Sequence, residues 1–441
     1  MQKLGIKVDV YSTVKNSVDY AKTLNFNNFY LINKIFLPTK IISTFKKILN
    51  YSWDYHLKYS NSRKFISFVQ NKNNDKFYKF IGFIIAKFKL TLIFNRFFIF
   101  LIRLYSNFTN KIDTKFKENL SNYDLVIFGW AYSDFNIIYA NYCKANKIKT
   151  CALISGYDNI STKSRILFNF DFYFIWSEYM EKEFNYFYPY VRNSQLKIIG
   201  NPQYEILKSK NFQTEKKLFF KNNNLNSEKL TVLYALGSPN LIREDIMMFE
   251  LFDFLNTTDI SNDIQFIIRP HPAFYDIADW ENLVSKYNFP IYIQKVEEVL
   301  KEKDFPSVKA VYEWVNAINH CDLLINATST ITFDAIFANK PVLNVNYDIK
   351  LLNTSNYSIK EINKNFSHAN IVVNSGGVHI CNNTVEIVNY LRNALNNFDE
   401  FNSLNLNCRK KLLSEICSLE IQSNPLDKFI KSIKEVLIDA K

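Results

Sequence analysis

The sequence predicts an α/β protein of two domains, each a parallel sheet with helices on both faces. A chain of 441 residues is longer than one ordinary hydrophobic core supports. Its 48% hydrophobic and 22% charged residues are typical of globular proteins and exclude wholesale disorder. Short apolar runs alternate with helical stretches, as parallel sheets require. We expect a first domain over 1–205, a linker over 206–229, a second domain over 230–425 and a C-terminal helix over 426–441.

The chain opens on residues 4–12, LGIKVDVYS, which predict the end of a helix, a glycine turn and a strand. In an α/β domain such a strand is usually the second one, and no first strand precedes it here. Two interpretations stay open: an opening β-α unit is missing from this chain, or the fold begins irregularly. Residues 10–118 are rich in Phe, Tyr and Lys and predict mainly helices.

From residue 124 the alternation becomes regular. In the first domain we expect strands at 124–129, 149–154, 171–176 and 196–199, with helices at 134–146 and 177–188. In the second domain we expect strands at 230–236, 264–268, 290–294, 322–326 and 341–345, with helices near 243–257, 310–319 and 331–338. Further helices are expected near 384–396, 407–419 and 426–439. The linker is predicted from its polar residues, rich in Lys and Asn.

The net charge of +12 favours an acidic partner: a nucleic acid, an anionic membrane surface or a phosphorylated ligand. The six cysteines are scattered without a C-x-x-C pair, which indicates reduced thiols in a cytoplasmic protein. The N-terminus has no apolar segment of the kind found in secretory signals.

One strongly apolar stretch, residues 79–108, is interrupted by Lys87, Lys89, Arg96 and Arg103. No charge-free run in it approaches the roughly 20 residues that span a bilayer. Two interpretations remain. The stretch forms a buried helical pair with cations that reach the solvent, or it rests on the anionic leaflet of a membrane.

Residues 264–276, IQFIIRPHPAFYD, place Arg269 and His271 between prolines at the end of a strand. Each proline fixes its own φ and biases the preceding residue toward an extended backbone. Both side chains are therefore presented rigidly, as a binding site requires. A histidine that is merely satisfied in the core is the alternative for His271.

A second polar group follows the predicted strand 322–326. Thr328, Ser329 and Thr330 stand where the next helix begins, so their hydroxyl and backbone N–H groups favour an anion such as phosphate. Simple N-capping needs only one of the three hydroxyls. Because ligands bind beyond the carboxyl ends of parallel strands, we expect this group and Arg269 and His271 to face one cleft between the domains.

An R-x-H-P segment after a strand, followed some 50 residues later by a D-x-x-I-x-x-x-S-T turn and a K-P-V strand, resembles the bacterial GT-B glycosyltransferases of surface-polysaccharide synthesis. These include capsular polysaccharide transferases, polysialyltransferases and the related teichoic-acid glycerophosphotransferases. The resemblance covers about 230–345 and implies two Rossmann-like domains facing across a cleft. It also implies that Arg269, His271, Thr328, Ser329 and Thr330 bind the nucleotide-phosphate of the donor, with a catalytic role for His271.

The first domain is expected to supply the acceptor side. Its best candidate is the loop SGYDNISTKSR at 155–165, in which Asp158 is the one carboxylate, with Asn159 and Lys163 beside it. The loop is similar to the W-D-N-x-(S/T)-(S/T)-K segment of these transferases, with Tyr157 in place of the tryptophan. Asp158 would act as the base of an inverting reaction or the nucleophile of a retaining one; an Asx-turn role is the alternative. Asp134 is the second candidate, although it could equally cap the helix that follows.

Several motifs that would indicate other kinds of chemistry are absent from the sequence. No H-x-x-x-H, D-x-D, G-x-G-x-x-G or P-loop occurs, so we expect no metal site, no cofactor and no dinucleotide or NTP chemistry. His379, in NSGGVHI, is expected in a hairpin or at the start of a strand.

The sequence thus predicts a cytoplasmic glycosyltransferase, peripheral on the inner membrane face. Its donor would be a nucleotide-sugar, a CMP-sugar first and a UDP-sugar next, and its acceptor a glycan or lipid-linked glycan. A CDP-polyol phosphotransferase of the teichoic-acid type is the alternative. A non-catalytic nucleic-acid-binding protein is a further one, disfavoured because the aromatic residues lie in apolar runs instead of alternating with cations.

Overall fold

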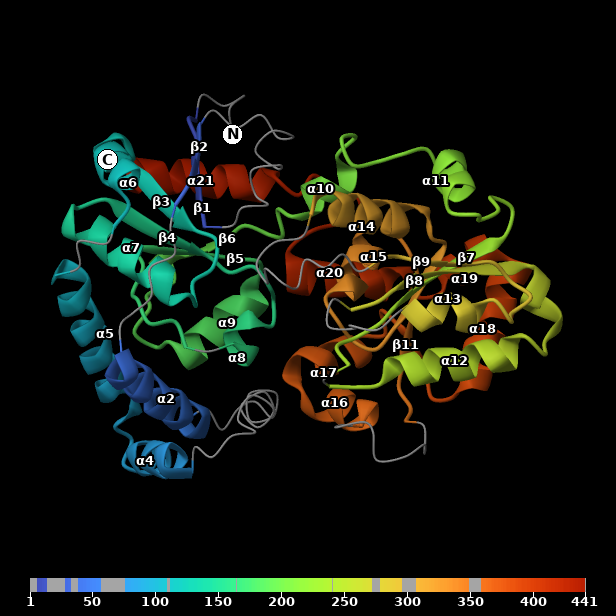
Figure 1. Cartoon of the computed structure of the whole chain (residues 1–441), viewed down its shortest axis with the longest axis horizontal. Helices are drawn as coiled ribbons and strands as arrows, with labels where there is room; N and C mark the ends of the chain where they lie inside the picture. Colours follow the sequence, from blue (N-terminus) through green and yellow to red (C-terminus); the bar gives the residue numbers. More distant parts are fainter. Residues whose placement is uncertain are drawn as a thin grey trace. The chain divides into compact units, whose positions relative to one another are not determined.

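The computed structural model describes residues 6–13, 28–32, 39–56, 76–108, 112–163, 165–239, 241–271, 278–295, 307–348 and 358–440. The chain divides into two compact units (Figure 1). Unit 1 comprises Met1–Gly200, Ile416–Ser418 and Leu426–Lys441, and unit 2 comprises Asn201–Glu415 and Leu419–Pro425. The boundary thus lies five residues before the expected end of the first domain at 205, and the C-terminal helix belongs to unit 1.

Unit 1 contains a four-stranded parallel sheet in chain order: β3 (Leu125–Phe128), β4 (Lys149–Leu153), β5 (Phe172–Ile175) and β6 (Leu196–Ile198). These are the four strands expected between 124 and 199. The C-terminal helix α21 (Asp427–Ala440) packs Ile433 and Val436 against Phe174 of this sheet.

A separate two-stranded parallel sheet pairs β1 (Asp9–Ser12) with β2 (Asn28–Leu31). The opening strand expected in LGIKVDVYS is therefore β1. That the domain lacks a first β-α unit, and that the two domains face each other across a cleft, stay predictions. The helices of unit 1 before α21 are α2 (Thr39–His56), α4 (Lys76–Lys87), α5 (Thr91–Phe108), α6 (Thr114–Asn119), α7 (Asp134–Ala145), α8 (Asn159–Thr162) and α9 (Glu178–Phe187).

Unit 2 is built on a six-stranded parallel sheet of order β12-β11-β10-β7-β8-β9. Its strands are β7 (Leu230–Ala235), β8 (Ile264–Arg269), β9 (Ile291–Ile293), β10 (Leu323–Asn326), β11 (Val342–Val345) and β12 (His379–Cys381). Five of them match the expected strands. His379 starts the sixth, a parallel edge strand. Of the two alternatives expected for His379, the start of a strand is therefore confirmed and the hairpin was wrong.

The helices of unit 2 cover both faces of this sheet. They are α10 (Tyr204–Lys208), α11 (Lys216–Asn222), α12 (Glu244–Leu255), α13 (Ala278–Val284), α14 (Val308–His320), α15 (Ile331–Phe337), α16 (Ile359–Asn365), α17 (Ser367–Val373), α18 (Thr384–Asn396), α19 (Phe398–Ser403) and α20 (Leu406–Cys417). Helices α14 and α15 contact β7, β10 and β11.

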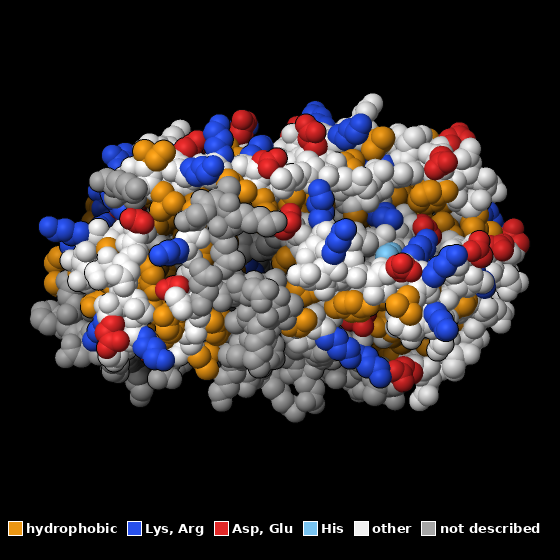
Figure 2. Space-filling view, turned by 90° about the horizontal axis from the view of Figure 1, so that it is seen from above, with side chains coloured by type: hydrophobic (Ala, Val, Ile, Leu, Met, Phe, Trp, Pro, Cys, Tyr) orange, Lys and Arg blue, Asp and Glu red, His pale blue; other side chains and the backbone are white. Residues whose placement is uncertain are grey.

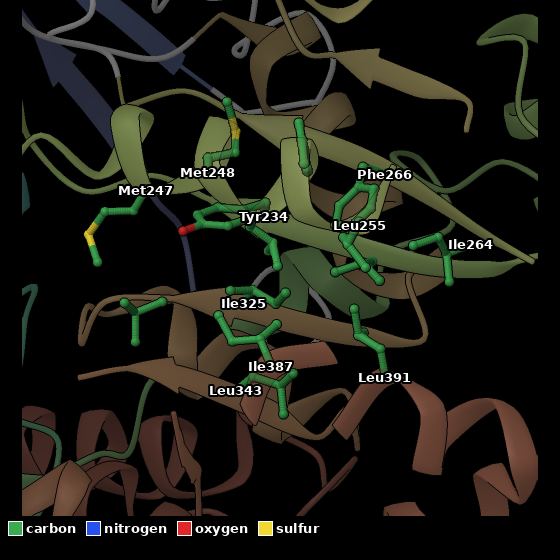
Figure 3. Packing of buried hydrophobic residues seen from close by; sticks show 14 of the residues in the cluster. Tyr234, Met247, Met248, Leu255, Ile264, Phe266, Ile325, Leu343, Ile387 and Leu391 are labelled. Atoms are coloured by element: carbon green, nitrogen blue, oxygen red, sulfur yellow. The ribbon is translucent and has the colours of Figure 1, made fainter. Parts of the chain in front are cut away.

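The core of unit 2 lies between the sheet and the pair α12 and α18. Figure 3 shows Tyr234, Phe266 and Ile325, from three neighbouring strands, packed in one cluster with side chains of these two helices. From α12 come Met247, Met248 and Leu255, and from α18 come Ile387 and Leu391. Alternate residues of each strand point to this side, because side chains of a strand alternate between the two faces.

The expected linker, 206–229, is instead a packed part of unit 2. Phe212, Phe219 and Phe220 are buried, and Asn316 of α14 donates from Nδ2 to the Phe212 carbonyl oxygen at 2.8 Å. The many Lys and Asn residues of this stretch obscured its apolar side chains, which hold it against α14.

The stretch 79–108 forms parts of α4 and α5, which are not a buried pair, since large apolar side chains of both helices are exposed. Among the described residues, no helix combines the length and the apolar character needed to cross a bilayer. On the face seen in Figure 2, basic and acidic side chains are interspersed on both units, so the net charge of +12 is not gathered into one patch there.

Candidate functional site

The strand order of unit 2 creates one position where a ligand is expected. From β7 the chain moves outward through β8 and β9, then returns to β10 on the other side of β7. The connections after β7 and β10 therefore leave in opposite directions, and such a switch point opens a crevice at the carboxyl ends of the strands.

Glu244 connects the two sides of this switch point. Its Oε2 accepts a hydrogen bond from the Gly237 N–H after β7 at 2.7 Å, and its Oε1 accepts from the Ala327 N–H after β10 at 2.6 Å. The side chain is fully buried, and burial raises the pKa of Glu244 to about 7, although both backbone donors lower it. Sequence reasoning missed Glu244, because an acidic residue in the first turn of a helix is ordinary.

Arg269 ends β8 within a polar network on the α14 side of the sheet. Its Nη1 donates to Gln294 Oε1 at 2.8 Å, and Gln294 Nε2 donates to the Glu313 carbonyl oxygen at 2.8 Å. Burial lowers the pKa of Arg269, while the carboxylates of Asp334 and Glu313 raise it. The guanidinium thus lies in the field of two acids of its own unit.

His271 follows two residues later and is half-buried. Burial lowers the pKa of His271, and the positive charge of Arg269 lowers it further, so the imidazole is mainly neutral at pH 7. Pro270 is buried, whereas Pro272 lies outside the described residues.

The three hydroxyls after β10 have different surroundings. Thr328 Oγ1 donates to Asn363 Oδ1 at 3.1 Å and accepts from Asn344 Nδ2 at 3.0 Å. Ser329 Oγ accepts from Asn326 Nδ2 at 3.0 Å. Thr330 is exposed and makes no capping bond with its side chain, so it is the hydroxyl of the three best placed to meet a ligand.

Asparagine amides extend this polar row across the neighbouring strands. Asn363 Nδ2 lies 3.1 Å from Asn346 Oδ1, and Asn346 Nδ2 donates to Asn382 Oδ1 after β12 at 2.9 Å. Sequence reasoning missed these amides, although the N-V-N and C-N-N runs at the ends of β11 and β12 could have indicated them.

Asp334 is a buried acid one turn into α15, four residues after Thr330. It accepts a hydrogen bond from Trp314 Nε1 at 3.0 Å. Burial raises the pKa of Asp334 to about 6, and the hydrogen bonds of Trp314 and Tyr204 and the charge of Arg269 lower it. The positive charge of Arg269 at the end of β8 thus favours the ionised form of this carboxyl.

In unit 1, the Asp158 loop is held by its own hydroxyls. The Thr162 hydroxyl lies 2.9 Å from Asp158 Oδ2 and 2.8 Å from the Asp158 carbonyl oxygen. Asp158 itself is half-buried, Asn159 is buried and Lys163 is exposed. Tyr157 is buried, and burial raises its pKa well above the ordinary range.

Asp134 is the first residue of α7, but Ser133 is the N-cap, with Oγ accepting from the Asn136 N–H at 3.5 Å. The capping role considered for Asp134 therefore belongs to its neighbour.

Glu183 on α9 is a further acid near Asp158 that sequence reasoning missed. It is buried, and its Oε1 accepts from the Tyr179 hydroxyl at 3.2 Å. Burial raises the pKa of Glu183 to about 8, the hydroxyls of Ser161 and Tyr179 lower it, and the charge of Asp158 raises it. Nothing in the helical pattern of 177–188 distinguishes this residue from a solvent-facing glutamate.

Comparison with known proteins bears on the fold. The chain matches no protein-family model, and no curated protein matches its sequence. The crystal structure of a UDP-N-acetylglucosamine 2-epimerase aligns with a TM-score of 0.50 and 10% identity, over 98% of this chain and 87% of that one. The fold is of the GT-B type.

Two further structures align less closely. The wall teichoic acid polymerase TagF has a TM-score of 0.45 and 14% identity, over 74% of this chain and 75% of that one. The UDP-GlcNAc 2-epimerase from Methanocaldococcus jannaschii has a TM-score of 0.44 and 11% identity, over 77% and 82%. At such identities the likeness concerns the fold and carries no residue assignments.

Proposed function

We propose that this protein is a metal-independent glycosyltransferase of bacterial surface-polysaccharide synthesis. It moves a sugar from a nucleotide-activated donor, a CMP-sugar first and a UDP-sugar next, to a growing capsule or lipopolysaccharide chain on a lipid carrier. The observation that carries the proposal is the strand order of unit 2, in which β8 and β10 both pair with β7. Arg269 ends β8 and the 328–330 hydroxyls follow β10, so both motifs come from the carboxyl edge of one sheet, beside the switch point between β7 and β10.

These groups suit a leaving nucleotide. As the bond between the sugar and the phosphate oxygen breaks, negative charge grows on the phosphate, and fixed donors and cations stabilise it. The Arg269 guanidinium, the N–H of the neutral His271 imidazole and the hydroxyl of Thr330 can supply that stabilisation. Glu244 holds the loops after β7 and β10 in register for this contact.

The acceptor chemistry is assigned to unit 1. A new bond forms between the acceptor oxygen and the anomeric carbon, and the acceptor proton passes to a base. Asp158 supplies that base in an inverting reaction, or attacks the anomeric carbon in a retaining one. Asn159, Lys163 and Asp134 are the accompanying candidates on the acceptor side.

A nucleotide screen tests the donor site. Thermal unfolding is followed with CMP, UDP, CDP and GDP, because a nucleotide at one hundred times its Kd stabilises the folded state by about 2.7 kcal/mol. For a domain the size of unit 2 this raises Tm by roughly 5–10 °C. Thr330→Ala should reduce the shift, whereas Thr257→Ala, at another exposed threonine of unit 2, should not. No shift with any nucleotide would contradict the proposal.

A transfer assay then tests the reaction. His271→Ala should abolish transfer while the protein stays folded, and full activity in this variant would remove the donor-site assignment. Sugar transfer adds no phosphate to the acceptor. A product that has gained one phosphate per transferred group, with release of CMP from a CDP-polyol, would establish the polyol-phosphate alternative instead.

A further inference from the structure

The outward faces of α4 and α5 carry large apolar side chains where polar ones are expected. Phe77 and Phe80 of α4, Ile93, Phe97 and Phe100 of α5, and Phe88 in the turn between the helices have exposed fractions of 52–69%. We call these six residues the apolar face. Both helices lie at the outside of unit 1 in Figure 1. An exposed group of this size on a folded protein usually marks an interaction surface.

The inward faces of the two helices show that this exposure is built into the packing. Thr91, Asn95, Phe98 and Ile102 of α5 are 0–2% exposed and recur at helical spacing, so they form the buried stripe. Two of these inward residues are polar and anchored, since the hydroxyls of Thr91 and Ser52 lie 2.6 Å apart and Asn95 Nδ2 donates to the Tyr190 hydroxyl at 3.3 Å. Rotating α5 to bury its phenylalanines would break both anchors.

Helix α4 is fixed in the same way. Gly82 packs so closely on α2 that a Cβ there would lie 2.6 Å from Tyr51 Cβ. Only glycine allows this approach, and it directs the opposite side of α4, with Phe77 and Phe80, away from unit 1.

The charges on the same helices indicate what covers the apolar face. Residues 76–108 contain six Lys and Arg and no Asp or Glu. Five of the six are exposed: Lys76, Lys87, Lys89, Arg96 and Arg103. Long cationic side chains reach lipid phosphates while aromatic rings enter the acyl boundary, so this combination complements an anionic leaflet.

We propose that the apolar face of α4 and α5, with its flanking cations, is the surface by which the protein docks on an anionic phospholipid bilayer without spanning it. The inference stands on the packing of unit 1 and does not depend on the proposed transferase site. It therefore has a test that needs no enzymatic activity.

The test is flotation of the full-length protein with phosphatidylglycerol-containing vesicles and with pure phosphatidylcholine vesicles. We expect binding to the anionic vesicles, at least about ten-fold tighter than to the neutral ones and weakening as salt increases. The double variant Phe80→Ser, Phe97→Ser should lower the partition coefficient at least about ten-fold. Lys89→Ala and Arg96→Ala should each lower it about five-fold.

Leu218→Ser and Leu404→Ser are the matched controls, since both leucines are exposed on unit 2 at 50% and 61%. They should bind vesicles as the wild type does, and all variants should keep their Tm within about 2 °C because the removed side chains are exposed. Wild-type protein that binds neither vesicle, or a double variant that binds as tightly as the wild type, would overturn the proposal. So would a concentration-dependent dimer that the double variant loses, without vesicle binding.

Discussion

Replacing Glu244 by glutamine is the sharpest probe of the switch point in unit 2. The carboxylate accepts from the N–H groups of Gly237 and Ala327 through different oxygens. A glutamine amide has one acceptor oxygen, so it can serve only one of these donors and leaves the other facing its NH2 group. An unsatisfied buried donor costs about 1–3 kcal/mol.

In the wild type, ionising the buried Glu244 carboxyl costs free energy of folding, and this cost depends on pH. Burial raises the pKa of Glu244 from 4.5 to about 7. Between these values the folded chain keeps a proton that the unfolded chain has lost. The stabilising contribution of Glu244 is therefore complete below pH 4.5 and falls as the pH rises through 7. At about 1.4 kcal/mol for each pH unit, the loss across this window is about 3 kcal/mol.

The unsatisfied donor in the variant and the ionisation of Glu244 in the wild type act in opposite directions. The stability that Glu244→Gln loses relative to the wild type should therefore decrease as the pH rises. At pH 5 the folded wild type keeps the Glu244 proton, yet the hydroxyl oxygen of a carboxylic acid can still accept a hydrogen bond, whereas the NH2 group of glutamine cannot. Glu244→Gln should therefore be less stable than the wild type at this pH by about 1–3 kcal/mol. At pH 8 the two proteins should be similar, or the variant slightly more stable. Taking the difference between the proteins removes the contribution of Asp334, whose pKa burial also raises, to about 6.

Hydrogen exchange of the β7 and β8 amides measures the free energy of opening within unit 2 alone, even if the two units unfold separately. The difference in this free energy between wild type and variant, followed from pH 5 to 8, should change by about 2.5 kcal/mol. If this difference in free energy stays constant from pH 5 to 8, Glu244 does not titrate as a buried residue that bridges the two loops, and the reasoning is refuted.

Three further outcomes follow from the structure. Asp158→Asn should lower kcat by about 10²- to 10⁴-fold with nucleotide affinity unchanged; an equal loss of both, measured by transfer rate and calorimetry, would make the residue structural. Glu183→Gln should stabilise unit 1 more at pH 9 than at pH 6 in hydrogen exchange, because burial raises the pKa of Glu183 to about 8 and its charged form is disfavoured above that value. A uniform effect would argue against that assignment. Phe252→Ala should destabilise unit 2 by about 3–5 kcal/mol in urea unfolding, since this ring is fully buried beside Phe266 and Phe289; a loss below 1 kcal/mol would mean that the site collapses around the cavity.

Most of the fold could be predicted because its signals are local. The apolar runs at 230–236 and 264–268 identify strands without knowledge of their neighbours, and the alternation with helices implies a parallel sheet. The edge strand β12 was less clear, because its three residues carry little apolar signal. The packed segment 206–229 was misassigned because its abundant Lys and Asn residues concealed three buried phenylalanines.

The candidate site, too, could be predicted only in part. Arg269, His271 and the 328–330 hydroxyls could be selected because prolines, a strand end and a helix start mark them within a few residues. The separate roles of the three hydroxyls could not be predicted from the sequence. Thr328 and Ser329 are hydrogen-bonded to asparagine side chains, while Thr330 is exposed.

By itself the sequence determined the α/β class, the positions of the main strands and the polar motifs at their ends, because each depends on residues adjacent in the chain. Only the tertiary structure decided that Glu244 bridges two loops, one of them 83 residues away, that Glu183 is buried beside the Asp158 loop, and that α4 and α5 turn phenylalanines outward. Strand order and burial are set by contacts between distant segments, and the pKa values and exposed surfaces that give these residues their chemistry arise only from those contacts.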